Sequence, residues 1–329
     1  MNILFIYRDK HYYNHNFNDI FNKNLCKIDF GFLLLSLKTI ANIKLMTVES
    51  VIKSKKKIDC DYVFIDAKIK IDYKEDECLP ILKKIIPSKV FVFLSYDKVI
   101  NFEDIYKFEK YFDVKSYFIP NLYKNLDNYK VPFFIKNKFQ QTHYGLGFTE
   151  IQYDFSKKNF LIEHVTNKYK YNLFYSGEKT KGKIIRTKII DDILNDKDIS
   201  NKKILYYESK DKNNYILSPD EYINYTQQAK INLVLAGNVN NITYRLYEVL
   251  FLRSFFLIDP HFSNFRISDN FDNISDITFL DLKDLIAKIK FYLNNYNYAE
   301  QIIKKNTKIF EKIYNPYNHG KYLKKIIQY

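Results

Sequence analysis

The feature that most constrains the fold is a regular alternation of short apolar runs and amphipathic segments, which occurs twice along the 329 residues. In the first half, the apolar runs have the length of buried strands, at 2–7, 43–48, 62–65, 90–94 and 114–119. Segments with helical spacing separate them, at 31–40, 79–86 and 101–111. Such alternation predicts an α/β fold with a parallel sheet and helices on both faces.

The alternation stops between Pro120 and about Lys170, where prolines, glycines and aromatic residues replace it. It then starts again, with strands predicted at 171–175, 203–207, 231–235, 255–258 and 277–280, and with helices toward the C-terminus. We therefore predict two Rossmann-like domains. The first covers residues 1–165, including the irregular connection, and the second covers 166–329, including the terminal helices.

The charge balance favours polyanionic partners. Lysine and arginine number 52 against 38 acidic residues, a formal charge of +14, which suits nucleic acid or an acidic membrane surface. Part of the lysine excess reflects a composition typical of AT-rich coding, with few glycines and prolines. Only five residues are arginine, and an arginine kept in this background points to a use for its planar, bidentate fork. They are Arg8, Arg186, Arg245, Arg253 and Arg266.

Cysteine and hydropathy patterns predict a cytoplasmic protein. Cys26, Cys60 and Cys78 lack metal-ligand spacing and fit a reducing compartment. Met1 leads directly into a predicted strand, and no apolar run approaches the roughly 20 residues of a membrane span. His143 and His164 lie in the irregular connection, where structural roles are the simpler interpretation.

The stretch 229–259 reads as strand, loop, helix and strand. Gly237 and Asn238 belong to the loop, and the helix begins near Thr243. Arg245 and Glu248 are three residues apart and share a face near the helix N-terminus, which carries positive partial charge and free N–H groups. Two interpretations remain open: a surface ion pair, or a clamp for an anionic ligand with hydroxyl groups, such as a nucleotide sugar.

The segment 176–183 is a second candidate for binding phosphate. It carries Gly177, Lys179 and Lys183, and Arg186 follows in the next predicted helix. The ending of a Walker loop is missing, but backbone amides and lysines can also hold phosphates. The alternative is a mobile basic loop. The basic run Lys53–Lys57 is read first as a solvated loop and second as a phosphate-contacting patch.

Asp97 is the candidate general base. It follows the predicted strand that ends at Leu94, and ligands of open α/β sheets bind beyond the carboxyl ends of strands. The alternative is an aspartate that caps a turn. Asp59 and Asp61 imitate a metal-binding Asp-x-Asp motif, but they precede a strand and are read as turn residues. No tightly bound metal is required, although a divalent ion is compatible with this interpretation.

These residues resemble the GT-B glycosyltransferases. The motif Thr243-Tyr-Arg-Leu-Tyr-Glu-Val-Leu, followed by Phe-Phe-Leu-Ile-Asp259, is similar to the donor-binding segment of group-1-like glycosyltransferases and of phage DNA β-glucosyltransferases. The resemblance implies that Arg245 contacts the diphosphate of a UDP-sugar and Glu248 its ribose hydroxyls. It also implies that the donor site includes Gly177, Lys179, Lys183, Arg186, Gly237, Asn238 and Thr243.

The same resemblance implies that Asp97 deprotonates the acceptor hydroxyl, and that direct attack inverts the anomeric centre. One departure is that the 176–186 segment carries lysines, differently spaced, where the phage enzymes carry arginines. The first expectation for the acceptor is a hydroxymethylated base in double-stranded DNA, in the host cytoplasm if the chain is phage-encoded. The alternatives are an envelope-glycan glycosyltransferase at the cytoplasmic membrane face and a non-catalytic nucleic-acid-binding protein. Neither the donor sugar nor the oligomeric state follows from the sequence.

Overall fold

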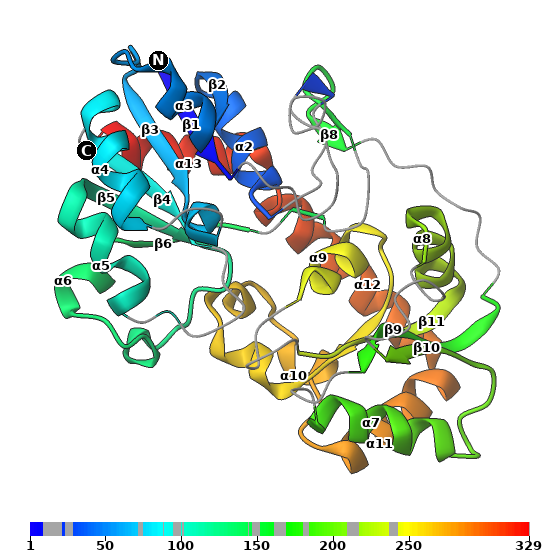
Figure 1. Ribbon diagram of the computed structural model, residues 1–329. Coiled ribbons are helices and arrows are strands. Elements are labelled where there is room, and N and C mark those ends of the chain that lie inside the picture. The colour runs from blue at the N-terminus through cyan, green and yellow to red at the C-terminus, as the bar shows by residue number, and fades with distance from the viewer. Residues whose placement is uncertain are drawn as a thin grey trace. The chain divides into compact units, whose positions relative to one another are not determined.

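A computed structural model describes most of the chain, namely residues 1–8, 22–23, 29–71, 75–87, 89–94, 100, 102–143, 145–146, 152–160, 169–179, 184–208, 217–236 and 243–328. The chain divides into two compact units (Figure 1). The first unit comprises 1–145, 151–161 and 314–329, and the second comprises 146–150 and 162–313.

The first unit is built on a six-stranded sheet in which every described pair of neighbouring strands is parallel. Its strand order is β2-β1-β3-β4-β5-β6. The strands are β1 (Asn2–Tyr7), β2 (Asn42–Thr47), β3 (Tyr62–Asp66), β4 (Lys89–Phe93), β5 (Asp113–Ile119) and β6 (Phe139–Gln141). The helices are α2 (Gly31–Lys38), α3 (Val48–Ser54), α4 (Glu75–Ile85), α5 (Phe102–Tyr111), α6 (Phe133–Lys136) and α13 (Pro316–Gln328). Shorter elements are η1 (Ala67–Ile71), η2 (Leu126–Asn128) and a hairpin of β7 (Tyr153–Asp154) and β8 (Asn159–Phe160).

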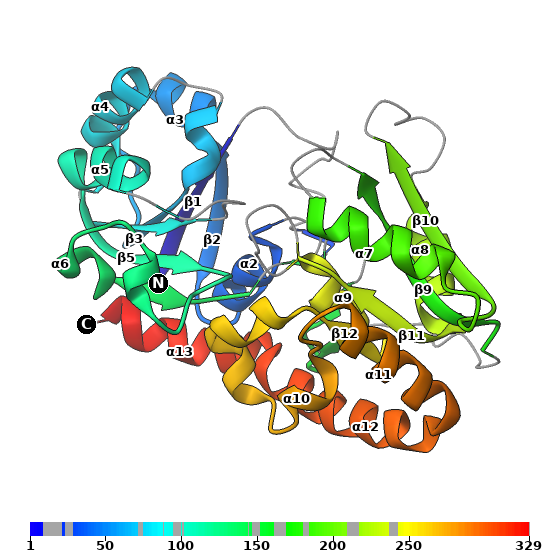
Figure 2. The same ribbon diagram turned by 90° about the horizontal axis from the view of Figure 1, so that it is seen from below.

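Alternate residues of these strands form two cores because successive side chains of a strand point to opposite faces. One face carries aliphatic residues such as Val63 and Val90, which pack under α3, α4 and α5 (Figure 2). The other face carries a row of aromatic rings, including Phe64 and Phe91 with ring centroids 4.9 Å apart, and packs against α2 and α13. Both faces of the sheet are therefore covered, as the near-continuous apolar runs predicted.

The second unit repeats the pattern with a four-stranded parallel sheet of order β10-β9-β11-β12. The strands are β9 (Tyr171–Lys179), β10 (Lys202–Glu208), β11 (Ala229–Val234) and β12 (Phe256–Ile258). The helices are α7 (Ile184–Asn195), α8 (Pro219–Gln228), α9 (Tyr244–Phe251), α10 (Ile274–Ile277), α11 (Leu282–Asn294) and α12 (Tyr296–Ile313), with η5 (Pro260–Asn264) and η6 (Arg266–Asn270). Both halves confirm the predicted α/β class.

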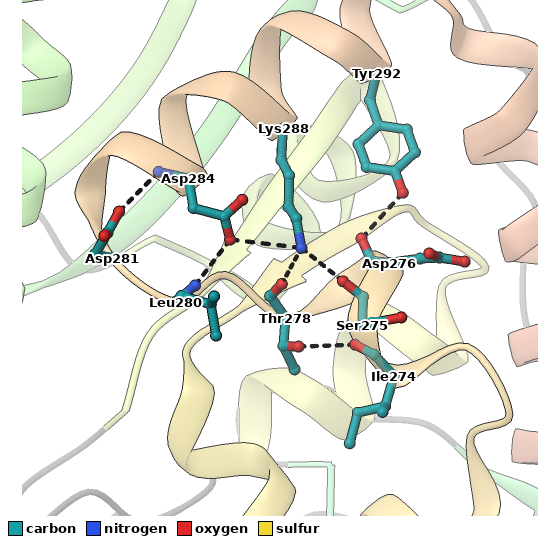
Figure 3. Close-up of polar contacts among 9 residues, drawn as sticks. All are labelled: Ile274, Ser275, Asp276, Thr278, Leu280, Asp281, Asp284, Lys288 and Tyr292. Carbon is teal, nitrogen blue, oxygen red and sulfur yellow. Dashed lines mark hydrogen bonds and ion pairs between the residues drawn. The ribbon is translucent and has the colours of Figure 1, made fainter.

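The predicted strand at 277–280 is wrong. Helix α10 occupies 274–277, and only a single bridge pairs Thr278 with Ile258 of β12. Lys288 of α11 stabilises the C-terminal end of α10. Its Nζ donates hydrogen bonds to the carbonyls of Ser275, at 2.6 Å, and of Thr278 (Figure 3). Asp284 lies 3.6 Å from the same Nζ. A lysine that satisfies the last carbonyls of a helix stabilises its end.

The last helix differs from the predicted assignment. The sequence placed all terminal helices in the second domain, whereas α13 belongs to the first unit and packs on α2. Leu323 and Ile327 of α13 are buried in the aromatic core of the first sheet. Tyr317 also donates a hydrogen bond from its hydroxyl to the carbonyl of Phe155 in the β7–β8 hairpin, at 3.0 Å.

Two buried histidines lie where α13 meets the rest of the first unit. The rings of His143 and His319 are 5.9 Å apart, and both pack against Phe32 of α2. Burial lowers the pKa of His143 to about 3, with a further contribution from His319, and burial lowers the pKa of His319 to about 4. Both side chains are therefore neutral in the folded protein near pH 7, in structural roles.

We expect the stability of the chain to fall as the pH drops from about 6.5 towards 4. The unfolded chain protonates both histidines below about 6.5, whereas the folded chain does so only near pH 4 and pH 3, so the loss is on the order of 2 kcal/mol per histidine at pH 5. Urea unfolding between pH 7.5 and 5 measures it. His319→Phe should reduce the change of the free energy of unfolding with pH, whereas His261→Phe should leave it as in the wild-type chain. Equal slopes in both variants would contradict the account.

In the part of the chain that the structure describes, no helix combines the length and the apolar character needed to span a bilayer.

Candidate functional site

The candidate site lies at the carboxyl ends of β9 and β11 in the second unit, where α9 begins. Asn232 of β11 pairs with Phe174 of β9, so Val234, the last residue of β11, is level with Ser176. Ligands of parallel α/β sheets bind at this edge. The segment predicted to bind the donor therefore lies at the carboxyl edge of the second sheet, where a ligand can bind.

Arg245 of α9 reaches across to β9. Its Nη2 donates to the carbonyl oxygen of Ser176, and its guanidinium carbon lies 4.9 Å from the centroid of the Tyr175 ring. A guanidinium over an aromatic face gains cation–π attraction as well as apolar contact. The buried Nε of Arg245 makes no hydrogen bond to the described residues, and so retains a donor for a ligand.

Glu248 lies one turn further along α9 and is only 2% exposed. The surface ion-pair interpretation of Arg245 and Glu248 is therefore wrong. Tyr222 of α8 interacts with both residues. Burial is the main cause that raises the pKa of its phenol, the Glu248 carboxylate raises this pKa further, and the Arg245 charge lowers it. A buried carboxylate requires such partners, because desolvation penalises its charge.

Arg186 of α7 joins the same cluster. It is buried, its Nη1 donates to the carbonyl of Ala236 at 3.4 Å, and its charge, like that of Arg245, acts on the Tyr175 phenol. Asp259 accepts a hydrogen bond from the amide of Ala236 through Oδ2. The chain that leaves β11 is thus held from two sides.

Gly177 and Thr243 shape the site in different ways. A Cβ added at Gly177 would lie 2.5 Å from the Tyr175 hydroxyl oxygen, so the glycine leaves room for that ring on the same face of β9. Thr243 is the N-cap residue of α9, but its side chain makes no capping hydrogen bond, and its buried Oγ1 makes none to the described residues either. The Thr243 hydroxyl therefore remains available to an anion at this end of the helix.

Several predicted residues lie outside the described part of the chain. They are Asp97, Lys183, Gly237 and Asn238, and the side chain of Lys179 at the end of β9 is likewise not described. Their roles stay predictions. Among the described residues, no group of three or more histidine, cysteine or acidic side chains could hold a metal ion. Asp61 accepts a hydrogen bond from the amide of Asn2 at 2.7 Å, which agrees with a turn role.

Sequence reasoning missed Tyr222, Ser176 and Asp259. Tyr222 follows the capping box of Ser218 and Glu221 that begins α8, and nothing local in the sequence indicates that its side chain reaches α9. The sequence does contain one indication of the Tyr175 contact. Tyr175 lies two residues before Gly177, and strand residues two apart share a face, so the glycine leaves space beside the tyrosine ring.

The combination of charges defines the ligand that the site suits. Two arginines contribute planar forks that match phosphate oxygens, and Glu248 contributes oxygens that accept hydrogen bonds from hydroxyl groups. A ligand with an anionic part and adjacent hydroxyls, such as a nucleoside diphosphate, satisfies both.

No family model matches the sequence, and no curated protein is similar to it in sequence. Solved structures are similar in fold. T4 phage β-glucosyltransferase in complex with UDP-glucose has a TM-score of 0.57 at 11% identity, with 100% of each chain covered. Anabaena Alr3699/HepE in complex with UDP has a TM-score of 0.55 at 8% identity, again with 100% of each chain covered. An α-glucosyltransferase in complex with UDP and a 13-mer DNA has a TM-score of 0.53 at 10% identity over 100% of each chain.

The fold is therefore that of the GT-B glycosyltransferases, as predicted. A further similar structure, with a TM-score of 0.57 at 12% identity, is that of a DNA modifying β-glucosyltransferase, and the DNA bound to the α-glucosyltransferase contains an HMU base.

Proposed function

We propose that the chain is a glycosyltransferase that transfers a sugar, with glucose the first candidate, from a UDP-sugar to an acceptor hydroxyl. The observation that carries the proposal is the convergence of Arg186, Arg245 and Glu248 at the carboxyl edge of the second sheet. Support comes from the fold, which is shared with three glucosyltransferase or UDP-bound structures over the whole chain.

In the proposed reaction, the bond between the anomeric carbon and the diphosphate oxygen breaks while the acceptor oxygen bonds to that carbon. The electron pair of the broken bond leaves with UDP, whose charge Arg245 and Arg186 stabilise. Asp97 takes the proton of the acceptor hydroxyl as general base, and attack from the opposite side inverts the anomeric centre. Glu248 orients the donor through its ribose hydroxyls. A divalent ion would supply further charge stabilisation, and the T4 enzyme has been crystallised with UDP and Mn²⁺.

For the acceptor, we propose a hydroxymethylated base in double-stranded DNA, reached in the cytoplasm of a host cell. The formal charge of +14 supports a polyanionic acceptor. A DNA-modifying β-glucosyltransferase and an α-glucosyltransferase bound to DNA with an HMU base share the fold, and both support this choice of acceptor class.

We expect the wild-type chain to move labelled glucose from UDP-glucose to a duplex containing hydroxymethylated bases and not to the same duplex without them. Scintillation counting of precipitated DNA measures the transfer. Asp97→Asn should lose at least about a hundredfold in rate, the range typical of a general base, while it binds UDP as wild type does. Transfer to a lipid-linked or free glycan, and not to DNA, would contradict the DNA acceptor and support the envelope-glycan glycosyltransferase. DNA binding without any UDP binding would leave only a non-catalytic nucleic-acid-binding protein.

A further inference from the structure

We propose that Tyr222 is a positioning residue of the donor site, which holds the Arg245 guanidinium and the Glu248 carboxylate in the arrangement that binds the nucleotide diphosphate. This inference rests on the proposed function, because it assigns a role in the same site. Tyr222 lies on α8, outside the segment that resembles known donor sites.

The ring of Tyr222 is fixed by its surroundings. It is 4% exposed, and it packs in an apolar cluster with Ala229 and with Phe174, whose ring centroid is 6.1 Å away. Its helix begins at a complete capping box, in which Ser218 and Glu221 satisfy each other's backbone amides, and the amide of Tyr222 donates to the carbonyl of Ser218 at 3.0 Å. A capping box of this kind fixes where a helix begins. Its helix and core therefore determine where the Tyr222 hydroxyl lies.

The hydroxyl is chemically suited to stand between the two charged groups. A phenol has one hydrogen to donate and can accept hydrogen bonds as well, so it can donate to Glu248 and accept from Arg245 at the same time. Burial and the neighbouring Glu248 raise the pKa of Tyr222, so the phenol keeps its hydrogen near neutral pH. A neutral bridge of this type lets both ions remain charged in a buried setting.

Three buried polar atoms of this cluster make no hydrogen bond of standard geometry with the described residues. They are Oη of Tyr222, Oη of Tyr175 and Nε of Arg245. Native proteins rarely leave several such atoms together, because each costs about 1–3 kcal/mol. A ligand that draws Arg245 and Glu248 into place would bring these atoms into hydrogen-bonding geometry. The cluster is thus built to be completed by binding, with Tyr222 as its fixed member.

Tyr222→Phe isolates the hydroxyl, because phenylalanine keeps the ring and its packing. Tyr225→Phe is the matched control. It lies on the same helix, and its ring also packs on Phe174, with a centroid distance of 5.7 Å, but its ring lies beneath Lys203. Both variants lose one phenol oxygen from the same helix.

Isothermal titration with UDP tests the role. We expect Tyr222→Phe to weaken UDP binding about tenfold, which equals about 1.4 kcal/mol. Tyr225→Phe should bind as wild type does. In the Arg245→Ala background, Tyr222→Phe should have a clearly smaller effect than in the wild-type chain, because only its role at Glu248 remains. A merely structural role would lower the melting temperature without producing this dependence.

Two outcomes would overturn the inference: wild-type UDP affinity in Tyr222→Phe, or effects of Tyr222→Phe and Arg245→Ala that simply add. Failure of the proposed function looks different. In that case the wild-type chain itself binds no UDP, which overturns the donor site and with it the role of Tyr222.

Discussion

Replacing Arg245 by alanine is expected to reduce the affinity of the chain for UDP at least about a hundredfold, which corresponds to about 2.7 kcal/mol. The change removes the guanidinium that lies over Tyr175 and donates to Ser176. It also leaves Glu248 buried without that cation, at the position where an anionic ligand must bind. Isothermal titration with UDP measures the loss.

Arg253→Ala is the matched control for this experiment. Arg253 follows the same helix, but its side chain is exposed and pairs with Glu311 at 3.3 Å. Exposed ion pairs of this kind contribute roughly 0–1 kcal/mol to stability, and Arg253 takes no part in the cluster described above. We expect unchanged UDP affinity. Equal losses in the two variants, or none in Arg245→Ala, would contradict the site.

The second large effect is expected at Gly320 of α13. A Cβ added there would lie 2.7 Å from the carbonyl oxygen of Ser36 in α2 and closer still to the Thr39 hydroxyl. Because the Ser36 oxygen belongs to the backbone of α2, the clash can be relieved only if α13 and α2 move apart. We expect Gly320→Ala to lower the free energy of unfolding by about 1–3 kcal/mol, the usual cost of overpacking, and Gly320→Val to lower it further.

The sign of this effect makes the experiment decisive. At an exposed position inside a helix, glycine to alanine stabilises by roughly 1 kcal/mol through helix propensity. A gain of that size on urea unfolding of Gly320→Ala would contradict the close packing of α13 on α2. Lys321→Ala, at the next and exposed position, should leave the unfolding midpoint within about 0.5 kcal/mol of wild type.

The sequence predicted the elements that depend on local pattern. The buried strands follow from the length and spacing of apolar runs, that is, from residues at most a few positions apart. The assignment of α13 depends instead on Gly320, Leu323 and Ile327 meeting α2 and the first sheet, far away in the chain. The strand predicted at 277–280 is instead the end of α10, where the carbonyls of Ser275 and Thr278 accept hydrogen bonds from Lys288, ten or more residues further along the chain.

The site was predicted in part. The spacing of Arg245 and Glu248 left both a surface ion pair and a ligand clamp open, and the burial of Glu248 decides against the exposed pair. Arg186 was predicted, and the structure brings it to the same tyrosine as Arg245. Tyr222 could not be predicted, because its contacts join α8 to α9 across intervening segments. Asp97 remains a prediction, outside the described residues.

The most direct measurement of the central claim is a calorimetric titration of the wild-type chain with UDP, with UMP and uridine titrated in parallel. If the arginine cluster binds a nucleoside diphosphate, UDP should bind saturably at one site per chain, and affinity should fall stepwise as each phosphate is removed. Heats that do not saturate with UDP, or equal affinities for UDP and uridine, would contradict the account.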